Sequence, residues 1–116
     1  MEHLFLSLAG EFETVSNRVF RSLGIDSPKF GESLNFGGVY AFVSVFGVLI
    51  QFESNFYDYE DRFDYMIAIK RDPLTDVQIT DEEIRAVAGI VQAMLLRNFR
   101  ITIGVERDDD LVVISP

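Results

Sequence analysis

Carboxylates are the side chains of this sequence whose types and spacing could do chemistry. Five of them gather within twelve residues: Glu53, Asp58, Glu60, Asp61 and Asp64. Two carboxylates can act as general acid and base when a pocket holds them together and partly desolvates one of them. These five instead fall in a connecting segment and at the start of a strand. We therefore expect no catalytic pair among them.

The other residues that could carry chemistry lack the partners that the chemistry needs. His3 is the single histidine, so a Ser–His hydrolytic triad has no other candidate base. Asp108, Asp109 and Asp110 could bind Mg²⁺ or Ca²⁺, but adjacent residues in a hairpin do not converge on one ion. The chain has no cysteine and no glycine-rich phosphate-binding motif. We expect no enzyme, no metal site and no cofactor.

One stretch, NFYDYEDRFDY at 55–65, interleaves aromatic and acidic residues. The alternation of the strand that follows, extended backwards, predicts that Phe63 and Tyr65 lie in the core. The remaining aromatics sit among acids, where they either pack within a loop or form a binding surface. Tyrosine supplies stiff, amphipathic contact area, and surrounding acids steer a basic partner. The predicted partner-binding residues are Phe56, Tyr57, Asp58, Tyr59, Glu60, Asp61 and Asp64.

The charge of the chain is strongly negative. Nineteen Asp and Glu face ten Lys and Arg, which gives −9 at pH 7. Such a chain is repelled by the phosphates of nucleic acids and by anionic membranes, and it attracts basic proteins. Solubility alone could explain the acidity, but the acids are grouped rather than spread evenly. The second-choice partner-binding residues, near the second helix and at the last hairpin, are Asp76, Asp81, Glu82, Asp108, Asp109 and Asp110.

The elements that must position these residues follow from hydrophobic periodicity. Apolar residues at spacings of three and four predict a helix over 3–23, ended by Gly24. Thr80 and Glu83 form a capping box that starts a second helix, which runs to about Asn98. Period-2 patterns and turn signals predict four strands, over 39–53, 64–71, 100–106 and 111–115.

This order, α-β-β-α-β-β, predicts a single α+β domain over residues 1–116. Its expected form is a four-stranded, mainly antiparallel sheet with both helices packed on one face. The strand at 39–50 is apolar on both faces, so the open face of the sheet needs a cover. We expect that cover to be either the 26–37 loop or a second copy of the chain, which would make the protein a homodimer.

The chain contains no apolar run long enough for a membrane-spanning helix. Its N-terminus, MEHLFLSLAGEFE, is apolar but carries Glu2 where a signal peptide has a basic region. We interpret this segment as an amphipathic helix, and we expect a cytoplasmic protein that binds no membrane.

Small size, strong acidity, the lack of cysteine and the acidic, tyrosine-rich stretch at 55–65 together resemble bacterial toxin immunity proteins, including those of contact-dependent inhibition systems. The resemblance is one of overall character. It implies a protein that neutralises a basic toxin, such as a nuclease, by covering its active site. Two alternatives stay open: a phage-type inhibitor that mimics DNA, against which the tyrosines count, and a non-catalytic assembly subunit that pairs through its sheet.

Overall fold

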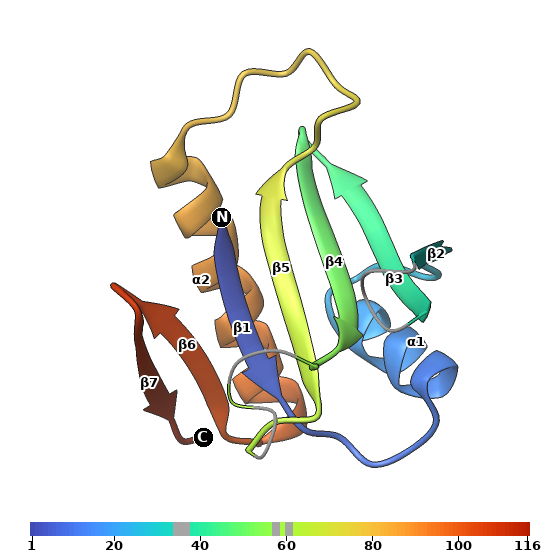
Figure 1. Ribbon diagram of the computed structural model, residues 1–116, viewed down its shortest axis with the longest axis vertical. Helices are drawn as coiled ribbons and strands as arrows, with labels where there is room; N and C mark the ends of the chain where they lie inside the picture. The colour runs from blue at the N-terminus through green and yellow to red at the C-terminus, as the bar shows by residue number, and fades with distance from the viewer. Residues whose placement is uncertain (34–37, 57–58, 60–61) are drawn as a thin grey trace.

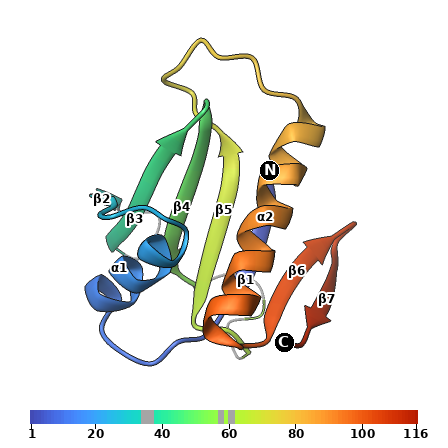
Figure 2. The same cartoon turned by 180° about the vertical axis from the view of Figure 1, so that it is seen from behind.

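The protein is built from one antiparallel sheet with two helices packed on one of its faces (Figures 1 and 2). The computed structural model describes residues 1–33, 38–56, 59 and 62–116. Within these residues the sheet has seven strands in the order β2-β3-β4-β5-β1-β6-β7. In chain order the elements are β1 (Glu2–Leu6), α1 (Phe12–Ser22), β2 (Lys29–Ser33), β3 (Gly38–Val45), β4 (Val48–Ser54), β5 (Tyr65–Arg71), α2 (Asp81–Phe99), β6 (Ile103–Arg107) and β7 (Asp110–Ile114).

The predicted α+β class agrees with this fold, but the four-stranded sheet and the order α-β-β-α-β-β are wrong. The first error is the helix predicted over 3–23, which is strand β1 followed by α1. Leu4, Phe5 and Leu6 are all buried, because β1 lies inside the sheet between β5 and β6 and is covered on both faces. A strand covered twice shows no alternation of apolar and polar residues. Gly10, with a φ of 130°, lies between the two elements.

The second error is the single strand predicted over 39–53. It is two strands, β3 and β4, joined by a two-residue turn at Phe46 and Gly47, with Val45 opposite Val48. Both turn residues have positive φ, 55° and 81°, as in the type I′ turn that joins tightly paired strands. The apolar pattern continues through the turn, so the sequence indicated only a bulge at Gly47. The chain reverses where a straight strand was expected.

The third error is the 26–37 segment, which was expected to be a loop. Its residues Lys29–Ser33 form β2, which pairs with β3 at the edge of the sheet. Gly31 lies opposite Tyr40, and a Cβ at Gly31 would come within 2.5 Å of the tyrosine ring. The ring therefore packs over the glycine. Charged residues and a glycine gave this strand no hydrophobic pattern that would identify it.

The second half of the chain agrees with the prediction. Helix α2 begins after Thr80, whose Oγ1 accepts a hydrogen bond from the Glu83 N–H at 3.1 Å. The Glu83 Oε1 accepts one in return from the Thr80 N–H at 3.0 Å, which completes the predicted capping box. The last two strands and their hairpin also lie where they were expected. In the described part of the chain, neither helix has the length and apolar character needed to cross a bilayer.

Removing the cap of α2 tests how much it stabilises the fold. Thr80→Ala is expected to lower the free energy of unfolding by about 0.5–2 kcal/mol, because the Glu83 N–H loses its acceptor. The measurement is equilibrium unfolding in urea. Thr75→Ala, in the exposed connection just before the helix, is the control and is expected to change stability much less. Equal stability of Thr80→Ala and the parent would contradict the assigned role of the cap.

A core lies on each face of the sheet. The larger core lies between the sheet and the helices, and Phe20, Phe52, Ile67 and Leu95 are among its fully buried members. Phe52 stacks on Tyr65 with the ring centroids 5.0 Å apart. This core holds α1 and α2 against the same face, as the sequence predicted.

The smaller core lies on the open face of the sheet. Phe5, Phe63 and Met66 are its buried members, and Tyr59 and Leu111 pack against it. Because Tyr59 and Phe63 belong to the connection between β4 and β5, this connection covers part of the open face. The expectation that the 26–37 segment covers that face is wrong, since the segment adds a strand to the sheet instead.

Candidate functional site

The connection between β4 and β5 carries the first-choice binding residues. Tyr57, Asp58, Glu60 and Asp61 lie outside the described residues. Among the described members, Phe56 is 58% exposed. Asp64 is also exposed, and its backbone N–H donates a hydrogen bond to Ser7 Oγ at 3.0 Å.

Tyr59, the third described member, packs on the sheet. Its ring meets Phe5 edge to face, with the centroids 5.3 Å apart. Two aromatic rings in this arrangement stabilise each other beyond the area they bury. The side chain is half-buried. At least one aromatic residue of this stretch therefore packs within the fold, which is one of the two interpretations that the sequence left open.

A buried carboxylate lies at the start of the same connection. Glu53 is only 1% exposed and faces the open side of the sheet, in register with Tyr40 and Met66. Gln51 Nε2 donates a long hydrogen bond of 3.4 Å to Glu53 Oε2. Burial raises the pKa of Glu53, and the Gln51 hydrogen bond and the charge of Lys70 offset this only in part.

Glu53 is therefore a desolvated carboxylate of the kind that an acid–base pair contains, but no second carboxylate accompanies it among the described residues. Its hydrogen bonds and charge neighbours among the described residues include no other carboxylate. Acid–base catalysis needs both groups within reach of one substrate. The described residues around Glu53 therefore form a buried polar site without the partner carboxylate that acid–base catalysis needs.

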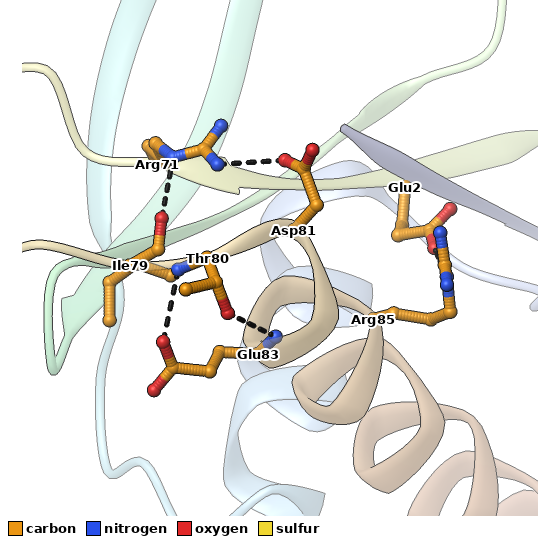
Figure 3. A network of polar contacts seen from close by, with 7 residues as sticks. All are labelled: Glu2, Arg71, Ile79, Thr80, Asp81, Glu83 and Arg85. Atoms are coloured by element: carbon orange, nitrogen blue, oxygen red, sulfur yellow. Dashed lines mark hydrogen bonds and ion pairs between the residues drawn. The ribbon is translucent and has the colours of Figure 1, made fainter.

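At the other end of the molecule, arginine side chains fix the start of α2 (Figure 3). Arg71 donates from Nε to the Ile79 carbonyl and from Nη2 to Asp81 Oδ1, both at 2.7 Å. This hydrogen bond and charge hold the pKa of Asp81 below its usual range. Arg85 pairs with Glu2 at 3.3 Å. The two ends of the connection between β5 and α2 are thereby anchored.

The connection between β5 and α2, residues 72–80, projects from the molecule beside the turn between β3 and β4 (Figure 1). Three apolar side chains of these two segments are exposed, and we call them the apolar tip: Phe46 at 86% exposure, Leu74 at 92% and Val77 at 54%. Sequence reasoning missed them. The signal for Phe46 was the Phe-Gly pair in the middle of an apolar run, which can turn the chain as well as bend it.

The second-choice acids lie around the same half of the molecule. Asp76 and Glu82 are exposed, and no ion pair holds either of them among the described residues. Asp108 and Asp109 occupy the turn between β6 and β7, at φ values of 49° and 66°. They line a cleft of 490 Å³ together with Arg85 of α2. Asp108 and Asp109 thus lie beside α2, whereas Asp76 and Glu82 do not line this cleft, and Asp81 is already paired.

His3 is not at the start of a helix, as the sequence suggested, but in β1. Its Nδ1 lies 3.4 Å from Glu106 Oε1 on the neighbouring strand β6. A histidine–carboxylate pair needs a nucleophile for covalent catalysis, and no hydroxyl group contacts this imidazole among the described residues. In the same part of the chain, no three His, Asp or Glu side chains gather closely enough to hold a metal ion.

Comparison with known proteins identifies no relative. No family model matches the chain, and searches of curated proteins and of solved structures gave no match.

Proposed function

We propose that this chain is a non-enzymatic binding protein that covers a basic protein partner, and that the partner is a toxin that it neutralises. The observation that carries the proposal is the unbalanced charge beside α2. Arg71 and Arg85 are already engaged with Asp81 and Glu2, whereas Asp76 and Glu82 are exposed and unpaired among the described residues. The exposed Asp108 and Asp109 of the β6–β7 turn add two further carboxylates beside α2.

Unpaired carboxylates on one side of a small protein create a field that a cationic protein follows. Such a field raises association rates and disfavours partners of like charge. The same negative field repels nucleic acids and anionic membranes. The step from a basic partner to a toxin rests on the resemblance to immunity proteins in size, acidity and composition.

The two alternative functions have less support. A DNA mimic needs acids spaced along a surface as phosphates are, whereas the exposed acids here sit on turns and at a helix start, with exposed Phe46 and Leu74 nearby. An assembly subunit that pairs through the open face of its sheet finds part of that face already covered by Tyr59 and Phe63.

The test is affinity capture of a basic protein from the source cells at low salt, followed by binding kinetics with the captured protein. The variant Asp76→Asn, Glu82→Gln, Asp108→Asn, Asp109→Asn removes four exposed acids near α2. We expect association to slow by about tenfold or more at low salt and the two proteins to converge at high salt, where exposed charges are screened. Co-expression with the toxin should restore growth with the parent chain and less well with the variant.

A matched control separates local from total charge. Glu11→Gln, Glu13→Gln, Asp26→Asn, Glu32→Gln also removes four exposed acids, so both variants carry −5 instead of −9. The control is expected to slow association much less. Equal slowing by both variants would assign the effect to net charge, and the retention of no basic protein at low salt would refute the proposed function.

A further inference from the structure

We infer that the apolar tip formed by Phe46, Leu74 and Val77 is the contact surface for the basic partner, and that it docks against apolar side chains set among lysines and arginines. This inference rests on the proposed function and adds the surface and the chemistry of its counterpart. Exposed clusters of large apolar residues are uncommon on proteins that act alone, and they mark sites of association.

Phe46 occupies a backbone position that does not suit it. It is the first central residue of a type I′ turn, with a φ of 55°, where asparagine, aspartate or glycine is strongly preferred. A bulky side chain in this left-handed region is strained. The ring gains little in return from the fold, because 86% of it is exposed. A residue that strains the backbone and leaves an aromatic ring in water suits a binding surface better than it suits folding.

The second half of the tip is held against that turn. The Asp72 N–H donates to the Gly47 carbonyl at 2.9 Å, and the Ser44 hydroxyl donates to the Asp72 carboxylate. The hydrogen bonds that the Asp72 carboxylate accepts from the Ser44 hydroxyl and the Leu74 N–H lower its pKa. Val77 packs over Gly47, where a Cβ would come within 2.7 Å of the valine Cβ. The tip is thus one surface made of two connected segments.

The charges near the tip indicate what can dock on it. Between residues 70 and 85 there are five acids and three cations, and two of those cations, Arg71 and Arg85, are already paired. A partner that buries the apolar tip therefore meets exposed Asp76, which lies between Leu74 and Val77 in the chain, and a lysine or arginine complements it. A second copy of the chain would face the same acids across a two-fold axis, so like charges disfavour it.

The test uses a synthetic amphipathic helical peptide of about 18 residues, with leucines on one face and lysines on the other. A control peptide carries glutamine at each leucine position and keeps the charge. We expect the leucine–lysine peptide to bind at least about tenfold more tightly than the control. Amide resonances of residues 44–48 and 72–79 are expected to shift on binding in nitrogen–proton correlation spectra.

Phe46→Asn is the decisive variant. Asparagine suits the left-handed turn, so the melting temperature is expected to rise or hold while peptide affinity falls by about tenfold or more. Leu74→Ser is expected to weaken binding as well without loss of the fold. The matched control is Phe30→Asn, which removes an exposed phenylalanine from β2 and should leave affinity unchanged. Phe56→Asn tests the competing surface, the β4–β5 connection at the opposite end.

The outcomes separate this inference from the proposed function. If neither peptide binds the parent chain at low salt, the apolar tip is not a docking surface, and the capture of a basic protein decides the proposed function separately. If both peptides bind alike and Phe46→Asn changes nothing, binding is purely electrostatic and the tip is not the site. If Phe56→Asn weakens binding instead, the β4–β5 connection is the site. If the parent self-associates in sedimentation and Phe46→Asn does not, the tip pairs copies of the chain and the inference is wrong.

Discussion

Phe5→Ala is expected to lower the free energy of unfolding by about 3–5 kcal/mol, the usual loss for a buried phenylalanine. Phe5 is 2% exposed and forms the centre of the smaller core, where Tyr59 and Phe63 pack on its ring. Its loss would leave a cavity under the β4–β5 connection. The measurement is equilibrium unfolding in urea, together with limited proteolysis, which should cut the connection more readily in the variant than in the parent.

Phe56→Ala is the control for this prediction. It removes the same type of side chain, but from the β4–β5 connection itself and at a position that is 58% exposed. Its effect on stability is expected to stay within about 0.5 kcal/mol, as for most surface substitutions. If the two variants lose equal stability, or if Phe5→Ala leaves the connection as resistant to protease as the parent, the connection does not depend on the smaller core.

Glu53→Gln is expected to stabilise the protein relative to the parent as the pH rises from about 4 to about 7, by roughly 1.4 kcal/mol for each unit by which folding raises the Glu53 pKa. The folded state raises this pKa above its ordinary value of 4.5 through burial. Between 4.5 and the raised value, the folded protein holds a proton that the unfolded chain has released. Stability of the parent therefore falls through this window, and the glutamine variant has no such loss.

The measurement is the difference in unfolding free energy between variant and parent at several pH values. Asp72, Asp81 and Glu83, whose pKa values folding lowers, contribute to both proteins and cancel in the difference. Glu11→Gln, at an exposed position, should show no such trend. A difference that does not change with pH would mean that Glu53 ionises in the folded protein as it does in water.

The apolar tip and the smaller core lie at opposite ends of the molecule, and their aromatic side chains differ in exposure. At the β4–β5 end, Tyr59 and Phe63 fold back over the sheet and complete it. At the α2 end, Phe46 and Leu74 point into solvent beside unpaired acids. Tyr59, one of the predicted binding residues, thus packs on the smaller core, while Phe46, which falls within the strand predicted over 39–53, is exposed.

The sequence by itself determined the elements whose signals are local. The capping box at Thr80 and Glu83 specifies where α2 begins, because the two residues satisfy each other's backbone donors without help from the rest of the fold. Helix α2 and the hairpin of β6 and β7 follow from patterns within their own residues. The excess of acids is likewise a property of composition, and the prediction of a basic partner rests on it.

Only the tertiary structure decided which strands exist and which side chains are free. β1 could be mistaken for part of a helix because burial on both faces removes the alternation that marks a strand, and that burial comes from β5 and β6, far away in sequence. Phe46 is exposed because the chain turns there, and Tyr59 is packed because Phe5 lies beneath it. A sequence rich in hydrophobic residues indicates that a core will form, but contacts between distant segments decide which of these residues are buried in it.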